Sequence, residues 1–137
     1  MLTRYILPLI CLLFIMKPTF ADIVNINNKQ IKELSKTNIP IVDIRRSSEW
    51  EQTGVIPKSI LLTFFDKNGK YIFDKWYANL RLKINEGKPI ILICRTGRRT
   101  KIIAEMMDKK LDNVIYNAQN GITSWIDAKL PTIKPKY

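Results

Sequence analysis

Apolar positions follow two spacings along this chain, one typical of strands and one typical of helices. Residues 89–93 read Pro-Ile-Ile-Leu-Ile, a continuous apolar run such as occurs in a strand buried on both faces of a parallel sheet. Beyond residue 99 the apolar positions recur with the period of one helix face. These positions are Ile102, Ile103, Met106, Met107 and Leu111. The pattern predicts a strand that ends just before Cys94 and a helix that begins near Thr100.

The two patterns alternate over the remaining chain. Strands are predicted within 22–26, 38–45, 55–62, 88–93 and 113–117. Helices are predicted over 27–36, from 47 to the break at 54, from 74 to 87, over 100–110, and from 121 to the stop at Pro131. Such alternation is typical of an α/β domain with a central, mainly parallel five-stranded sheet and helices on both faces. Ligands of such sheets bind at the carboxyl ends of the strands, where Cys94 is predicted to lie.

Polar residues mark where the predicted helices begin. Asn27 or Asn28 can cap the first helix, a serine the second and Asp74 the third. The segment 63–73 is harder to assign, because the turn sequence Asp-Lys-Asn-Gly-Lys stands between aromatic residues; it can form a loop packed near a functional site. Three aromatic residues are expected in the core: Trp50, Trp76 and Trp125.

The N-terminal 21 residues have the pattern of a secretory signal peptide. A basic start precedes an apolar run over 6–16, and small residues at Thr19 and Ala21 favour cleavage after Ala21. The alternative is an uncleaved membrane anchor, but the run contains Pro8 and is well short of the roughly 20 residues that span a bilayer. We therefore expect one exported domain, residues 22–137, without stable membrane insertion and periplasmic in a Gram-negative bacterium.

The chain is strongly basic, with a formal net charge of +11. Only Arg4 and Lys17 fall in the predicted leader, which contains no acid, so the mature domain remains basic. This charge favours attraction of anions, either nonspecifically or as steering of a small anionic substrate. Lysine and arginine are scattered along the sequence without interleaved aromatic residues, so nucleic acid is not an expected partner.

Cys94 becomes the one cysteine of the mature chain if Cys11 leaves with the leader. It then has no internal disulfide partner. It is either a small buried apolar residue at the end of a strand or a thiol that takes part in the protein's chemistry. The chain has no histidine, which excludes a Cys-His pair and a Ser-His-Asp triad, and nothing in it resembles a metal site.

The sequence after Cys94 favours a reactive thiol. Residues 94–99 read Cys-Arg-Thr-Gly-Arg-Arg, and a loop curled by the freedom of Gly97 can point its amides toward the sulfur. The start of the following helix and the three arginines add positive potential. Together they are expected to stabilise a thiolate, the nucleophilic form of cysteine.

Four ordered motifs then resemble the rhodanese domains, the family of thiosulfate:cyanide sulfurtransferases and their relatives. Cys-Arg-Thr-Gly-Arg-Arg-Thr after an apolar strand resembles the family's active-site loop. The segments 41–45 with Glu49-Trp50, 54–60, and Gly121-Ile122 with Trp125 and Pro131 resemble its other motifs, so the likeness covers essentially all of the mature chain. The departures from the family pattern lie at scaffold positions: Val55, Lys58 and Asn120.

The resemblance implies a covalent sulfur transfer without metal or cofactor. Cys94 would attack the outer sulfur of thiosulfate or a similar donor and hold a persulfide, which a thiol, cyanide or protein acceptor then takes. The binding residues would be the loop residues Arg95, Thr96, Gly97, Arg98 and Arg99, supported by Asp43 and Arg45. Arg95 and Arg98 would draw in the anionic donor unless they are only surface side chains, and Arg99 would close the loop by pairing with Asp43.

Two other interpretations stay open from the residues. Cysteine phosphatases and arsenate reductases have arginine at the sixth position after the cysteine, whereas Thr100 stands there in this chain and Arg99 comes one residue early. The shorter loop has less room for a tetrahedral oxyanion than for a single sulfur atom. The other interpretation is a noncatalytic or relay module, in which Cys94 stores sulfur for a partner protein or does nothing.

Overall fold

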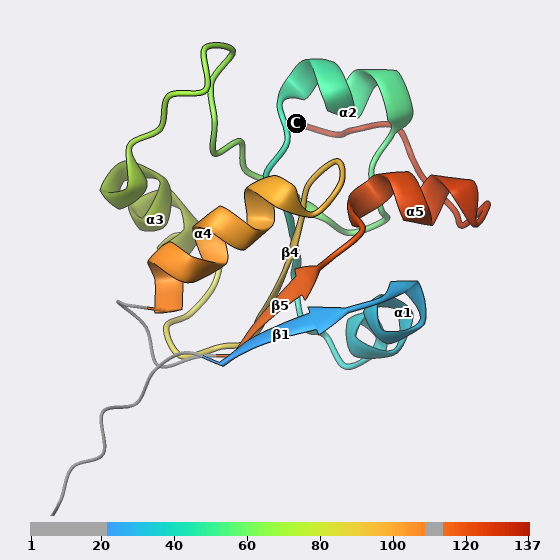
Figure 1. The fold of residues 1–137 in the computed structure, drawn as a ribbon, viewed down its shortest axis with the longest axis horizontal. Coiled ribbons are helices and arrows are strands. Elements are labelled where there is room, and N and C mark those ends of the chain that lie inside the picture. Colours follow the sequence, from blue (N-terminus) through green and yellow to red (C-terminus); the bar gives the residue numbers. More distant parts are fainter. Residues whose placement is uncertain (1–21, 109–113) are drawn as a thin grey trace, which may run out of the picture.

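A computed structural model of the protein describes residues 22–108 and 114–137 (Figure 1). Its strands form one five-stranded parallel sheet in the order β1-β5-β4-β2-β3. The predicted α/β domain with a parallel sheet is thereby confirmed. The strands are β1 (Ile23–Ile26), β2 (Ile41–Asp43), β3 (Ile60–Leu61), β4 (Ile90–Ile93) and β5 (Ile115–Ala118); the helices are α1 (Asn28–Lys36), α2 (Ser47–Thr53), α3 (Phe73–Arg81), α4 (Arg98–Asp108) and α5 (Gly121–Asp127).

The central strand β4 divides the core into two layers. Successive side chains of a strand point to opposite faces, so Leu92 and Cys94 share one face while Ile91 and Ile93 share the other. The first face packs under α3 and α4, and the second under α1 and α5 (Figure 1). All four β4 residues are buried, as the continuous apolar run predicts.

Each covering helix contributes a narrow apolar face. On the Cys94 side, Leu80 of α3 and Met107 of α4 are buried against the sheet. On the other side, Ile31 of α1 and Ile122 of α5 are buried in the same way. The three tryptophans belong to the core as predicted, with 4–5% exposure at Trp50, Trp76 and Trp125.

Helix starts differ from the predictions at three places. Asn27 caps α1 as expected, with its side chain accepting from Gln30 N. The start of α2 is closed instead by Glu49, whose carboxylate accepts from Arg46 N at 3.1 Å, rather than by a serine cap. Helix α3 begins at Phe73, ahead of the predicted cap at Asp74. Helix α4 begins at Arg98, so Arg98 and Arg99 belong to its first turn.

The predicted leader, residues 1–21, and the junction 109–113 lie outside the described residues, and so do Cys11 and Leu111. Within the described ranges, no helix is long and apolar enough to cross a membrane.

Candidate active site

Cys94 lies at the carboxyl edge of the sheet, directly after β4. Ile44 N donates to Ile93 O at 3.0 Å, which continues the pairing of β2 with β4 to the last residue before the cysteine. The cysteine is only 1% exposed and its side chain joins the core layer under α3 and α4. Strand β4 thus places the enclosed Cys94 thiol just before the loop that leads into α4.

A short loop closes around the sulfur. Gly97 N donates to Cys94 Sγ at 3.1 Å, and the Thr100 hydroxyl lies 3.6 Å from the same sulfur. The Thr100 hydroxyl also donates to Gly97 O at 3.0 Å, which ties the first turn of α4 back to the loop. The sulfur therefore faces an amide at the positive end of an eleven-residue helix, a setting that stabilises an anion.

The start of α5 fixes the opposite side of the loop. Ile122 N donates to Cys94 O at 2.9 Å, and Thr123 donates to Arg95 O from both its amide at 3.1 Å and its hydroxyl at 2.9 Å. Because a trans peptide points its N–H opposite to its C=O, the amides that follow these two carbonyls point away from α5. The contact with α5 thus orients the loop backbone as well as holding it.

Two glycines permit this close packing. Gly97 has a φ of +88°, and a Cβ on it would overlap Gln119 O. Gly121 has a φ of +58°, and a Cβ there would overlap Arg95 O. Both positions combine left-handed backbone with no space for a side chain. The expected role of Gly97 in curling the loop agrees with this geometry.

Arg99 pairs with Glu49, not with Asp43 as predicted. Arg99 Nη1 donates to Glu49 Oε2 at 2.9 Å and Nη2 donates to Oε1 at 2.6 Å, a two-point contact that joins α4 to α2. Burial alone would raise the pKa of Glu49, but the hydrogen bonds from Arg99 and from Arg46 N outweigh it and lower that pKa from 4.5 to about 2. The Glu49 carboxylate in turn raises the pKa of Arg99. Arg99 thus ties the first turn of α4, which follows the loop, to the neighbouring helix α2.

Asp43 is occupied by a different arginine. Arg45 Nη2 lies 2.7 Å from Asp43 Oδ2, and both side chains are essentially fully buried. Arg45 also donates to Gly54 O at 2.9 Å and to the Thr53 hydroxyl at 2.8 Å. These contacts join the end of β2 to the end of α2, which carries Glu49. That this pair supports the site stays a prediction.

The remaining loop side chains face outward. Arg95, Thr96 and Arg98 are all exposed. Arg95 lines a cavity of about 220 Å³ between α2 and α5, together with Gln52 and Ile126. Arg95 therefore lies at the surface beside the loop, while the thiol itself is enclosed.

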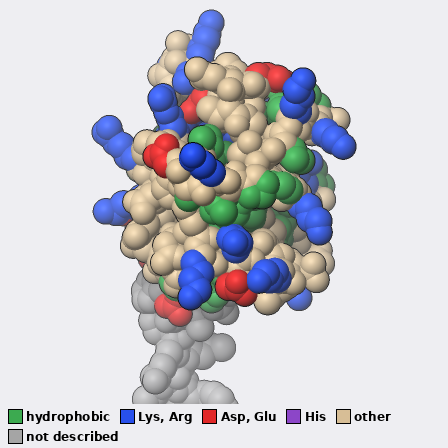
Figure 2. Space-filling model, turned by 90° about the vertical axis from the view of Figure 1, so that its right-hand side faces the viewer, with side chains coloured by type: hydrophobic (Ala, Val, Ile, Leu, Met, Phe, Trp, Pro, Cys, Tyr) green, Lys and Arg blue, Asp and Glu red, His purple; other side chains and the backbone are tan. Residues whose placement is uncertain are grey.

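Basic side chains are not confined to the loop. Figure 2 shows lysine and arginine scattered over one face of the molecule, with few acidic side chains among them. No single basic stripe forms on that face.

Glu49 and Thr100 are site residues whose contacts the sequence patterns did not reveal. The family-like Glu-Trp segment was a signal for Glu49, which the local pattern assigned only to the first turn of α2. Thr100 was noted as the last residue of the family-like loop motif and as the residue at the sixth position after Cys94, without a role in the site. Both roles depend on contacts that only the folded chain creates. Glu49 contacts Arg99, and Thr100 contacts Cys94.

A family model for the rhodanese-like domain matches residues 27–128. The chain belongs to the rhodanese-like domain family. Among solved structures, Rv0390 from M. tuberculosis is 24% identical to it, with a TM-score of 0.70 over 84% of this chain and 100% of that one. No curated protein matches the sequence significantly.

Two further solved structures with the same fold carry different functional descriptions. The polysulfide-sulfur transferase homodimer from Wolinella succinogenes is 20% identical to this rhodanese-like chain, with a TM-score of 0.64 over 85% of this chain and 82% of that one. A protein of unknown function from Rhodopseudomonas palustris, described as a possible tyrosine phosphatase, is 25% identical, with a TM-score of 0.58 over 81% of this chain and 85% of that one. Both structures share the fold of this chain.

Proposed function

We propose that this rhodanese-like protein is a sulfurtransferase that works through a persulfide on Cys94. The Cys94 thiolate attacks the outer sulfur of thiosulfate, the S–S bond of the donor breaks, and sulfite leaves with the electron pair. An acceptor thiolate or cyanide then attacks the outer persulfide sulfur and restores the Cys94 thiolate. The two steps conserve charge and need no external oxidant or cofactor.

The contact from Gly97 N to Cys94 Sγ at 3.1 Å carries this proposal. A backbone amide already aimed at the sulfur requires no rearrangement to stabilise negative charge there. The positive end of α4 lies beside the loop and likewise needs no rearrangement. The Thr100 hydroxyl, 3.6 Å from the sulfur, would turn its one proton from Gly97 O to an anionic sulfur. In the persulfide the negative charge lies on the outer sulfur, one S–S bond beyond Sγ, where the other loop amides and the helix start would stabilise it.

Enclosure of the thiol favours sulfur over phosphate as the transferred group. At 1% exposure, Cys94 can be approached by a small terminal sulfur more readily than by a tetrahedral centre with several oxygens. The exposed Arg95 and Arg98 then hold the anionic end of the donor outside the loop. Arg99 is less suited to this purpose, because both of its terminal nitrogens donate to the Glu49 carboxylate, which balances its charge.

The proposal is tested by incubating residues 22–137 with thiosulfate and measuring the intact mass. The expected product carries one additional sulfur atom, and Cys94→Ser abolishes the gain. Turnover of thiosulfate with cyanide should then exceed hydrolysis of a phosphate ester, and the reverse ranking would identify a phosphatase. A stable persulfide without turnover to small acceptors would identify a relay module that passes sulfur to a partner protein.

We further propose that the domain acts after export, with residues 1–21 removed. The support is the sequence pattern of the leader. The N-terminus of the protein isolated from its native compartment should be Asp22. Isolation of a full-length N-terminus from the cytoplasm would overturn this assignment.

A further inference from the structure

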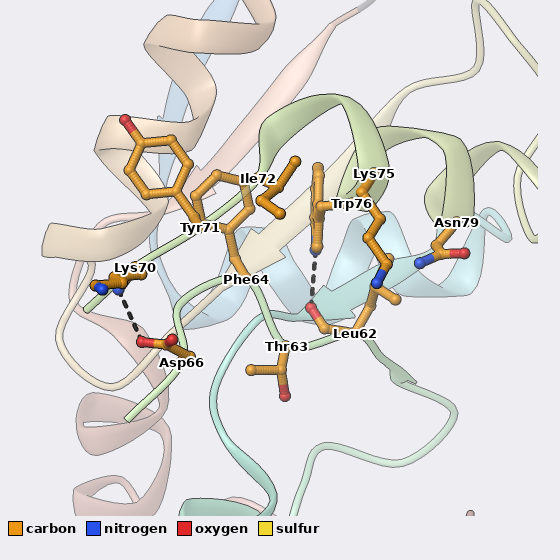
Figure 3. Close-up of a pocket in the computed structure, with 10 residues that line it drawn as sticks. All are labelled: Leu62, Thr63, Phe64, Asp66, Lys70, Tyr71, Ile72, Lys75, Trp76 and Asn79. Carbon is orange, nitrogen blue, oxygen red and sulfur yellow. Dashed lines mark hydrogen bonds between the residues drawn. The ribbon is translucent and has the colours of Figure 1, made fainter. Parts of the chain in front are cut away.

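A second cavity lies between α3 and the segment that follows β3 (Figure 3). Its volume is about 500 Å³, within the range of pockets for small organic ligands, roughly 300–1,000 Å³. The lining residues are Leu62, Thr63, Phe64, Asp66, Lys70, Tyr71, Ile72, Lys75, Trp76 and Asn79. None of them belongs to the Cys94 loop.

The walls of this aromatic cavity are preformed. Asp66 closes the turn by accepting from Asn68 N and Lys70 N, each at 2.8 Å. Phe64 stacks on Tyr71 with a centroid distance of 4.9 Å, and Trp76 Nε1 donates to Leu62 O at 3.0 Å. The two sides of the segment are thus fixed to each other and to α3. A ligand would meet a shaped surface without ordering it first, which favours binding.

The segment leaves apolar surface exposed around this hollow. Ile72 is 68% exposed and Tyr71 45% exposed, although both adjoin buried Phe64 and Trp76. Exposed aromatic and branched side chains that gather at a concave site, rather than singly, are typical of binding surfaces. An occupant with a flat or branched apolar body would cover them.

Cations lie at the edge of the same cavity. Lys70 and Lys75 both line it, and neither forms an ion pair within the described ranges 22–108 and 114–137. Figure 3 shows the amino group of Lys75 and the amide of Asn79 on one side of Trp76, with Phe64 and Tyr71 on the other. Both polar groups can donate to an anion while the rings contact its apolar body.

We infer that the aromatic cavity binds a small organic anion, a sulfonate or carboxylate with an aromatic or branched apolar body. The cavity also lies at the same edge of the sheet as the thiol. Phe64 N donates to Ile44 O at 3.1 Å, and Ile44 N donates to Ile93 O at 3.0 Å, so two strand spacings, roughly 10 Å, separate the backbone of Phe64 from that of Cys94. The inference concerns binding only and stands independently of sulfur transfer.

The test uses 1-naphthalenesulfonate with the Cys94→Ser form of residues 22–137, in which no persulfide chemistry can contribute. Binding is followed by the NMR signal of the Trp76 indole N–H. Saturable binding is expected, with a shift of that signal but not of the Trp125 signal. Methanesulfonate, which lacks the ring, and 1-naphthalenemethanol, which lacks the charge, should each bind at least about tenfold more weakly.

Two variants and two matched controls locate the site. Ile72→Ser and Lys75→Met should each raise the dissociation constant roughly fivefold, whereas Leu82→Ser and Lys83→Met, which change exposed residues outside the cavity, should leave it unchanged. Ile72 is the residue that precedes α3, where serine is a favoured cap, so that variant is expected to fold.

Equal effects of the cavity and control variants would overturn the inference, as would absence of any Trp76 shift. Tighter binding of an acidic peptide or of anionic phospholipid vesicles than of 1-naphthalenesulfonate, lost in Ile72→Ser, would replace the small anion by that partner and also overturn it. A protein that forms no persulfide but binds the probe would refute sulfur transfer alone.

Discussion

The contact between Glu49 and Arg99 gives the most quantitative prediction about the loop. Glu49→Gln keeps the shape of the side chain but removes its charge and turns one acceptor into a donor that faces Arg99. The wild-type pair has two charge-assisted hydrogen bonds at 2.9 and 2.6 Å, with side-chain exposures of 24% for Arg99 and 14% for Glu49. The substitution therefore leaves a mostly covered guanidinium with one neutral partner.

The expected loss in the free energy of unfolding is about 2 kcal/mol. A hydrogen bond to a charged group contributes about 1.5–3 kcal/mol, and partial solvent exposure reduces this contribution. For a domain of this size such a loss lowers the melting temperature by roughly 6–10 °C. Glu33→Gln is the matched control, because Glu33 pairs with Lys36 at 2.9 Å but both side chains are 60% or more exposed. It should cost less than about 0.5 kcal/mol.

The pH dependence separates the charge of Glu49 from its packing. Its pKa in the folded protein is lowered from 4.5 to about 2, so its contribution is complete above pH 4.5 and is lost as the pH falls toward 2. Urea unfolding of wild type and Glu49→Gln should therefore differ at neutral pH and converge over that window. A difference that stays constant with pH, or equal losses in Glu33→Gln and Glu49→Gln, would refute this reasoning.

Three further substitutions probe the loop itself. Gly97→Ala should lower the free energy of unfolding by at least about 2 kcal/mol and abolish persulfide formation. Gly69→Ala is the control, at a similar φ of +74° but with open space around its Cβ, and it should cost only about 1 kcal/mol. Equal losses in urea unfolding would refute the argument from packing. Thr100→Val should slow persulfide formation in stopped-flow measurements roughly tenfold, whereas Thr100→Ser should keep the wild-type rate. Equal rates for the two variants would show that the hydroxyl does not assist persulfide formation. Arg95→Ala should raise the Michaelis constant for thiosulfate severalfold at low salt and less at high salt, and an unchanged constant at low salt would make Arg95 a surface residue only.

Local pattern was sufficient to predict most of the scaffold. The apolar run of β4, the helix period after it and the glycine in between place Cys94 at a strand-to-helix junction without any long-range information. Helix boundaries were less well predicted, because Arg98 and Arg99 carry no apolar signal and yet join the first turn of α4.

Long-range pairing was not readable from the sequence. Arg99 was predicted to pair with Asp43, but in the folded core Arg45 occupies Asp43 and Arg99 pairs with Glu49. The segment 63–73 likewise showed only a turn between aromatic residues. Their arrangement as cavity walls requires Tyr71 to stack on Phe64 and Phe64 to pack against Trp76 of α3, contacts across a turn that no periodic pattern indicates.

A single-turnover experiment tests the central claim most directly. The reduced protein is mixed with excess thiosulfate, released sulfite is measured, and the modified residue is located by peptide mass spectrometry. Sulfur transfer through the loop predicts one sulfite per protein chain, with the additional sulfur on Cys94 and no reaction in Cys94→Ser. Sulfite release that persists in Cys94→Ser, or an intact reduced Cys94 that releases none, would contradict it.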